Sequence, residues 1–331
     1  MKNTYTLLLK KLTTTLAVSG YEWQLGITEI IQSLVGTKGR RIGDNLVYTF
    51  GSGKNPLFIS AHMDEVGFFI SQKGKDFVRI MPIGDIDIQV LNGIRLVFPF
   101  NRKLIFSNRL SSVKSFSTLK VRGLNKLPIG SVGTFEKFIS IKNEIIAATS
   151  LDNKVGCLAI IEAIKTLQQQ KQQIKKKIVF CFSCREEVGV NGLMSAIKYF
   201  DPKMCIDIDS AYAQPMNTTN RKNWIIPICG KGLALQLMGK DFIIGSRVLN
   251  SAKKICDEYK ISFQYELPDK INGGTNARTI MNNGYEILQV NIPVANQHSQ
   301  KSVVNLFDIE QTSKFITRFI EKYNQNDSVV I

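Results

Sequence analysis

The order of apolar and polar residues predicts alternating strands and helices over most of the chain. From Val155 to Leu167 an apolar residue recurs every three positions, which is typical of a largely buried helix. Residues 178–182 and 204–208 are continuous apolar runs of strand length. Such strands, alternating with helices, indicate a mostly parallel sheet covered on both faces. Further helices are expected at 4–18, 22–35, 190–199, 242–259 and 306–323, and further strands at 41–50, 56–62, 66–72, 76–81 and 286–290.

Residues 86–148 break this rhythm. The segment is basic, rich in β-branched and aromatic residues, and interrupted by Gly or Pro at positions 93, 99, 123, 128, 130 and 133. Short strands joined by turns have this composition. We therefore expect an α/β fold, with a mostly parallel-centred mixed sheet flanked by helices, formed by residues 1–85 and 149–331. A small β-barrel-like domain is expected to be inserted at 86–148.

Composition narrows the class of protein. With 331 residues, of which 44% are apolar, the chain can bury a sizeable core. No apolar run approaches the roughly 18 residues of a membrane-spanning helix, and the first residues are too polar for a signal-peptide core. We expect a cytoplasmic protein with reduced cysteines. Cys181 and Cys184 form a C-x-x-C pair inside or beside an apolar strand, and buried core positions are favoured over a redox or zinc site.

The charge is large and uneven. The net charge is +16, and residues 88–135 contain eight basic side chains and no acidic one. Such a surface can attract nucleic acid or acidic ligands. No nucleic-acid-binding motif accompanies it, so a solvated or substrate-steering face is the favoured interpretation, and no nucleic-acid or membrane partner is expected.

Acidic and imidazole side chains follow the predicted strands or open the predicted helix near 153. Ligands of open α/β sheets bind beyond the carboxyl ends of the strands, so these side chains should gather at one edge. Buried carboxylates would repel one another there unless a cation neutralised them, and two divalent ions would do so. Imidazole and carboxylate suit zinc-type metals. The residues are His62, Asp152, Glu186, Glu187, Asp209 and His298, and the chain has no other histidine.

Ordered motifs support this interpretation. Residues 18–22 read V-S-G-Y-E, 61–67 read A-H-M-D-E-V-G, 151–157 read L-D-N-K-V-G-C, 185–192 read R-E-E-V-G-V-N-G, and 297–299 read Q-H-S. In this order and over nearly the whole chain they resemble the motifs of the M42 metallo-aminopeptidases, also called the glutamyl aminopeptidase or tetrahedral aminopeptidase family. Related peptidase clans share the order of ligands, but an insertion between Asp64 and Asp152 is the M42 placement.

The resemblance implies a zinc-peptidase type of fold and two divalent metal ions per subunit. His62 and Asp209 would bind one ion, Glu187 and His298 the other, and Asp152 would bridge them. Zinc is the expected metal, with cobalt or manganese as alternatives, because His and carboxylate sites accept all three.

The resemblance also implies the catalytic roles. Glu186 would be the general base, taking a proton from a metal-bridging water and passing it to the leaving amine. Asp64 would orient His62. The protein would then be an aminopeptidase that hydrolyses N-terminal residues from short peptides.

Two of the ligands have rivals. Asp152 taken alone could be only the N-cap of its helix. Asp207 points to the same strand face as Asp209, because side chains alternate along a strand. The spacing favours Asp209.

The chain departs from the family pattern in three places. Residues 273–278 read G-G-T-N-A-R where the family has G-G-T-D-A-G, so Asn276 and Arg278 leave the substrate preference open. Ser302 stands where the family has an acid after its His-Ser. The inserted segment is shorter than usual, so we expect a homo-oligomer that is a dimer, with the tetrahedral dodecamer as the alternative.

Two other functions stay open. The first is a glycoside hydrolase that uses Glu186 and Glu187, since family members have carried cellulase labels; adjacent residues rarely place carboxyls at glycosidase separation. The second is a catalytically weak metal-binding homologue, suggested by the altered 273–278 loop. If the basic segment covers the pocket, it would steer acidic peptides.

Overall fold

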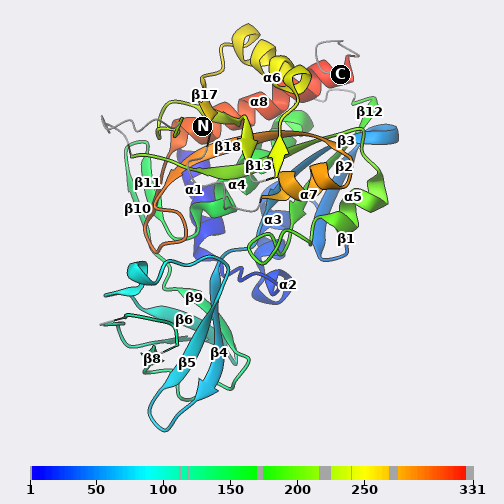
Figure 1. The fold of residues 1–331 in the computed structure, drawn as a ribbon. Helices are drawn as coiled ribbons and strands as arrows, with labels where there is room; N and C mark the ends of the chain where they lie inside the picture. The colour runs from blue at the N-terminus through cyan, green and yellow to red at the C-terminus, as the bar shows by residue number, and fades with distance from the viewer. Residues whose placement is uncertain are drawn as a thin grey trace.

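The chain folds into a large mixed sheet surrounded by helices and a smaller, separate sheet (Figure 1). The structure is a computed structural model that describes residues 2–111, 113–117, 119–169, 174–215, 225–239, 241–267 and 275–325. Gly273 and Gly274 of the altered loop motif lie outside these residues.

The large sheet has eleven strands and a parallel centre. Strands β12, β3, β13 and β18 run parallel to their neighbours at its middle, where nearly every side chain is buried on both faces. The α/β expectation is therefore confirmed. In sheet order the strands are β1 (Arg40–Ile42), β2 (Asn45–Phe50), β12 (Lys176–Ser183), β3 (Ser52–His62), β13 (Met204–Tyr212), β18 (Glu286–Ala295), β19 (Ser302–Asn305), β11 (Ile145–Ala148) and β10 (Ile139–Lys142), with β14 (Leu233–Gln236) and then β17 (Phe263–Glu266) beside β18.

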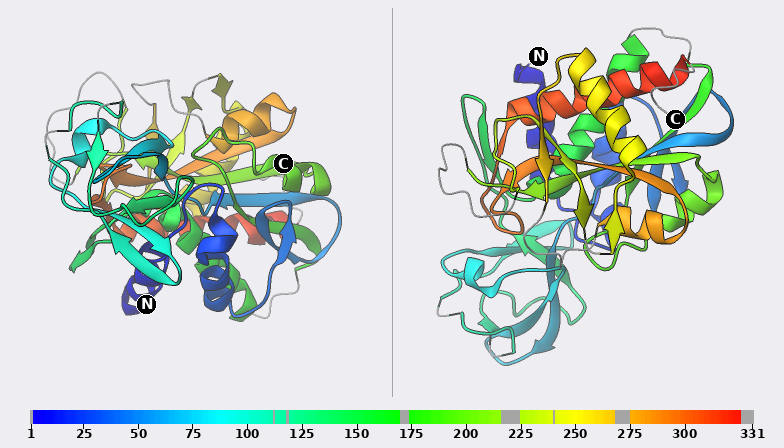
Figure 2. Two further views of the ribbon diagram at one scale, coloured as in Figure 1. Left: turned by 90° about the horizontal axis from the view of Figure 1, so that it is seen from below. Right: turned by 45° about the horizontal axis from the view of Figure 1, so that its top comes forward.

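Helices cover both faces of this sheet. Helix α4 packs on β3 and β13, and α1, α3 and α8 pack against α4. Helix α7 lies on the opposite face from α1 and α3, as the view from below shows (Figure 2), and contacts β13 and β18. The helices are α1 (Lys2–Thr14), α2 (Glu22–Leu25), α3 (Ile27–Val35), α4 (Leu151–Gln169), α5 (Met194–Phe200), α6 (Ser246–Glu258), α7 (Asn276–Asn282) and α8 (Leu306–Asn324).

The smaller sheet lies below the large one in Figure 1 and encloses its own apolar core, which extends from Val66 to Phe135. Its six strands begin at Gly67, whereas the sequence pattern placed the inserted segment at 86–148. The pattern of β4 and β5 does not reveal which sheet they join, and β10 and β11 pair with the large sheet through β19. The strands are β7 (Lys103–Phe106), β6 (Leu96–Phe100), β9 (Val132–Phe135), β4 (Gly67–Lys73), β5 (Val78–Ile83) and β8 (Lys120–Val121); η1 (Ile88–Leu91) is a 3-10 helix, and β15 (Met238–Gly239) and β16 (Phe242–Ile243) form a separate pair.

Several helix and strand boundaries differ from those that the sequence periodicity predicted. The helix expected at 22–35 is two helices, because Gly26 has a left-handed φ of 88° that ends one and begins the next. The helix expected at 190–199 begins only at Met194, since residues 186–190 form a turn closed by hydrogen bonds to the Glu186 carbonyl. The strand expected at 41–50 is a hairpin of β1 and β2.

Two sequence expectations concern features away from the site. All six cysteines are buried free thiols, and burial raises the pKa of Cys181 well above its ordinary value. This agrees with the core interpretation of the C-x-x-C pair. Among the described residues no helix is both long and apolar enough to cross a membrane.

Candidate metal centre

The first group of candidate ligands surrounds His62 at the carboxyl end of β3. Its Nε2 atom lies 3.1 Å from Asp152 Oδ1 and 3.3 Å from Asp209 Oδ1. Asp209 comes from β13, the parallel neighbour of β3, and Asp152 from the start of α4. All three side chains are buried, and one ligand atom from each lies within 4.8 Å of the others. One imidazole and two carboxylates at this separation form a donor set that suits one divalent cation.

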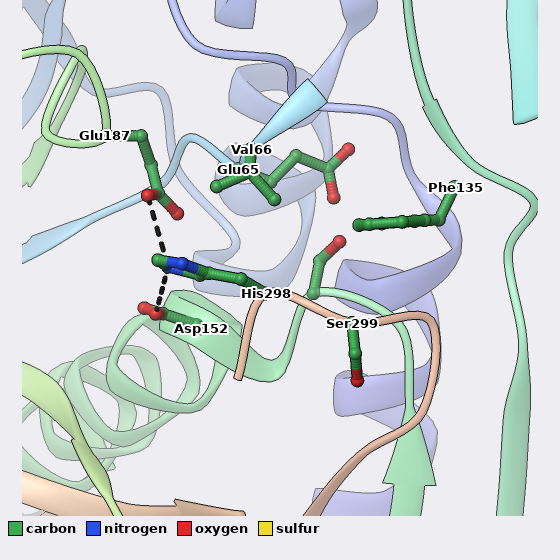
Figure 3. A pocket seen from close by; sticks show the side chains of 8 residues that line it. Glu65, Val66, Phe135, Asp152, Glu187, His298 and Ser299 are labelled. Atoms are coloured by element: carbon green, nitrogen blue, oxygen red, sulfur yellow. Dashed lines mark ion pairs between the residues drawn. The ribbon is translucent and has the colours of Figure 1, made fainter. Parts of the chain in front are cut away.

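The second group shares Asp152 with the first. His298 Nε2 lies 3.2 Å from Asp152 Oδ2 and 3.3 Å from Glu187 Oε2, and Figure 3 shows the imidazole between the two carboxyls. The other ring nitrogen, Nδ1, donates a hydrogen bond to the Asp85 carbonyl at 2.6 Å. Because a carbonyl can only accept, Nδ1 is the donor in this bond, and Nε2 is the ring nitrogen that faces the carboxyls of Asp152 and Glu187. Asp152 therefore presents one oxygen to each histidine.

The turn that carries Glu186 and Glu187 is held by two buried acids. Asp64 accepts the backbone N–H of Glu186 on Oδ1 and that of Glu187 on Oδ2, each at 3.2 Å. Glu22 accepts the preceding N–H, from Arg185, at 3.0 Å. Asp64 Oδ1 also lies 3.5 Å from His62 Nδ1. Three successive N–H groups are thus fixed by side chains from distant segments, and Asp64 contacts both His62 and the Glu186–Glu187 turn.

Burial and crowding shift the ionisation of these groups. Burial raises the pKa of Glu186 well above its ordinary value, and the neighbouring carboxyls of Asp209 and Glu187 raise it further, although His62 opposes this. Burial also raises the pKa of Glu187, against the charge of His298. For Asp152 burial alone would raise the pKa, but hydrogen bonds with His298 and His62 hold it far below its usual range.

The crowding of buried carboxyls also bears on whether divalent metal ions would fit this site. Glu187 Oε1 is buried and accepts no hydrogen bond from the described residues. A buried carboxylate oxygen without a donor is costly unless a cation approaches it. Acidic side chains outnumber imidazoles in this space, so the donor set fits divalent cations.

Two lysines lie behind the centre. Lys154 is fully buried and donates hydrogen bonds to the Met63 and Asp64 carbonyls, which fixes the backbone just after His62. The Lys137 ammonium lies 2.5 Å from Glu65 Oε2 and 3.2 Å from Ser150 Oγ. Burial would raise the pKa of Glu65, but the charges of Lys137 and Lys154 bring it below its ordinary value. This ion pair joins the two segments that connect the sheets.

A small pocket opens beside the second group. Asp152, Glu187 and His298 line it from the part of the molecule built on the large sheet. Val66 and Phe135 line it from the core of the smaller sheet (Figure 3). The ring of Tyr212 also meets the His298 ring edge-on, with centroids 6.4 Å apart. The pocket is therefore built by both parts of the molecule.

All the residues selected from the sequence as ligands meet here, and Asp207 lies outside both groups. Sequence reasoning did not assign roles to Glu22, Lys137 or Lys154. Glu22 and Lys154 lie inside motifs, at 18–22 and 151–157, so their position in those motifs was the available signal. Lys137 had none, because its partner Glu65 is 72 positions away.

Comparisons with known proteins agree with this geometry. The chain is 25% identical to the lysyl aminopeptidase of Pyrococcus furiosus, over 97% of this chain and 98% of that one. It is 21% identical to the glutamyl aminopeptidase of Lactococcus lactis, over 81% of each. Two solved structures share the fold: an aminopeptidase of Desulfurococcus kamchatkensis (TM-score 0.88, 22% identity, 99% and 98% covered) and the TET1 peptidase of Pyrococcus horikoshii (TM-score 0.83, 24% identity, 96% and 99% covered).

The family itself is shown by a sequence model that spans most of the chain. The model of the M42 glutamyl aminopeptidases matches residues 44–106 and 122–315. These ranges include every candidate ligand, as well as Asp64 and Glu186. The chain therefore belongs to the M42 glutamyl aminopeptidase family and is a peptidase hydrolase.

Proposed function

We propose that this protein is a dinuclear metal-dependent aminopeptidase that removes N-terminal residues from short peptides. The observation that carries the proposal is the placement of Asp152 between His62 and His298, with one carboxylate oxygen toward each. A shared carboxylate between two imidazoles is the arrangement expected of a two-ion site, and it is difficult to explain as an N-cap alone.

The ligands divide into two sets. His62 and Asp209 would hold one ion, Glu187 and His298 the other, and Asp152 both. Zinc is the proposed metal, with cobalt or manganese as alternatives. When bound, the ions would polarise the scissile carbonyl and lower the pKa of the attacking water.

Glu186 is the proposed general base. It is 8% exposed, and no described residue donates a hydrogen bond to its carboxyl in the structure. Its raised pKa suits a group that accepts a proton from water and later donates it to the leaving amine. Asp64 would hold that carboxyl in place through the backbone N–H of Glu186 and would orient His62.

The charge of the site and the size of its pocket indicate which substrate it would accept. A free N-terminal amine of the substrate would bind one of the ions or a nearby acid, which favours cleavage from that end. The pocket beside the second ligand group is small, which suits a single terminal residue of a short peptide.

The test is the release of N-terminal residues from a peptide panel by metal-loaded protein, with Zn²⁺, Co²⁺ and Mn²⁺ in turn. Glu186→Gln should lower kcat by about 100-fold or more while the protein still binds metal, because general acid–base catalysis contributes about 10²–10⁴-fold. The matched control is Glu286→Gln, at a partly exposed acid that pairs with Arg247. Unchanged peptidase activity in Glu186→Gln would refute the assigned base. Polysaccharide cleavage that survives chelation would instead support the glycoside hydrolase.

Assembly and location form a further part of the proposal. Solved relatives include a dodecamer, and the Pyrococcus horikoshii TET1 peptidase assembles into a tetrahedron or an octahedral shell. We place this protein as a cytoplasmic homo-oligomer, a dimer, with the dodecamer as the alternative. The smaller unit would serve as lid and oligomerisation surface. Light scattering after size exclusion measures the subunit number directly.

A further inference from the structure

A second polar group lies directly behind the first candidate ligand group. It consists of Ser60, Ser183, Asp207 and Asn276, and each of the four side chains is at most 1% exposed. Ser60 donates to Asp207 Oδ1 at 2.5 Å. The amide of Asn276 donates to the same oxygen at 3.3 Å and lies 3.3 Å from Ser183 Oγ. Neither the ligand assignment nor the proposed chemistry uses any of these residues.

The register ties this group to the ligands. Ser60 stands two residues before His62 on β3, and Asp207 two residues before Asp209 on β13, so each shares a strand face with a ligand. Ser60 is the register partner of Asp207, and Ser183 is that of His62. A shift of Asp207 therefore moves the strand end that carries Asp209 relative to the one that carries His62.

Asn276 adds a tie from outside the sheet. It is the first residue of α7, which packs on β13 and β18 from the face opposite α1 and α3. Its amide contacts Ser183 at the end of β12 and Asp207 within β13. Asp207 Oδ2 is buried without a donor among the described residues, so Asp207 depends on the donors that reach Oδ1.

The chemistry of this contact is specific for an acid facing an amide. An ionised carboxylate only accepts hydrogen bonds, whereas an amide can donate. An aspartate at 276 would remove the amide donor and place a second carboxyl against Asp207, leaving the Ser60 hydroxyl as the remaining side-chain donor to Asp207 Oδ1 among the described residues. Two buried carboxyls at this separation repel one another.

We propose that Asp207 and Asn276 are a positioning pair: their acid–amide contact aligns the strand ends that carry His62 and Asp209 for metal binding. The inference rests on the proposed metal-binding role of those two residues. It also gives a physical reason for an amide at 276, where the resembled family motif has an acid.

A charge swap tests the pair. Asn276→Asp should weaken Zn²⁺ binding, measured by calorimetry, by about 10–100-fold, the usual effect of removing a group that orients a ligand. Asp207→Asn alone places two amides together and should also weaken it. The double variant Asn276→Asp with Asp207→Asn restores one acid facing one amide and should recover Zn²⁺ affinity to within about threefold of wild type. Asn283→Asp, near the exposed end of α7, is the matched control and should change nothing.

The readouts separate this inference from the proposed function. Zn²⁺ affinity is measured without substrate, so a wild type that binds Zn²⁺ but cleaves no peptide would refute the activity and leave the pair testable. A double variant no better than Asn276→Asp, or an Asn276→Asp variant with wild-type affinity, overturns the pairing. If Asn276→Asp does not fold by circular dichroism, the swapped double variant alone decides: folding with near-wild-type affinity supports the pair, and failure to fold overturns it.

Discussion

Both sheets bury apolar side chains, but they differ in the charged side chains they bury. At the carboxyl edge of its parallel strands the large sheet buries Asp64, Asp152 and Asp209 beside an imidazole. The described core of the smaller sheet consists of apolar residues, among them Phe68 and Phe135 packed edge to face. The smaller unit instead carries its charge in a segment with eight basic and no acidic residues at 88–135. Burying charge is expensive unless a partner neutralises it, so the large sheet is where a cation is needed.

Polar contacts join the two parts of the molecule. The Asp85 carbonyl, from the chain between β5 and η1, accepts a hydrogen bond from His298 Nδ1, and Glu65 pairs with Lys137. The first ligand group depends only on the large sheet, whereas the second depends on both. The two sheets therefore do not act independently at the metal centre.

The largest expected effect is on stability, at the junction. Lys137→Met leaves Glu65 buried without its nearest cation and should lower the free energy of unfolding by about 3 kcal/mol, the low end for a broken buried pair because Lys137 remains 12% exposed. Urea unfolding measures this change in the free energy of unfolding. Lys142→Met, on exposed β10, is the control and should have a negligible effect. Equal stability of the two variants would show that the junction contributes little.

The next effect separates the two ligand groups. His62→Ala and His298→Ala should each reduce bound metal from about two equivalents to about one, and lower kcat/KM by more than about 100-fold. No third histidine exists to replace either one. Metal analysis after dialysis reports the stoichiometry, and each variant serves as the control for the other. Retention of both ions in either variant would contradict the division.

A smaller effect is expected at Asp64. Asp64→Ala removes the acceptor for the N–H groups of Glu186 and Glu187 and should lower kcat/KM by about 10–100-fold. Asp44→Ala removes the surface ion pairs of Asp44 with the side chains of Arg41 and Arg185 and should have little effect. Steady-state kinetics of both variants make the comparison, and similar losses would show that the side chain of Arg185 matters as much as the backbone.

The smallest effect tests the basic surface. If the 88–135 segment steers substrates, kcat/KM for acidic peptides should fall with salt by less than about tenfold, since screening shortens the reach of surface charge. Neutral peptides of equal length are the control. A salt response shared by both peptides would point to a general ionic effect.

Much of the fold was readable from periodicity, because burial on both faces forces a continuous apolar run such as 178–182. The parallel centre and the helices α4 and α8 were predicted in this way. The membership of β4 in the smaller sheet was not, since an apolar strand looks alike in any sheet. The broken helix at Gly26 was missed because glycine is also tolerated inside helices.

The sequence by itself selected the candidate ligands, because only two histidines exist and each stands in an ordered motif. It also determined that strand ends would bring them to one edge, since strand direction follows from the α/β alternation. Only the tertiary structure decided that Asp207 lies outside the ligand groups and pairs with Asn276. It alone joined Lys137 to Glu65 and Asp85 to His298. Such partners are far apart in the chain, and side-chain contacts between distant segments depend on register and packing, which no local pattern encodes.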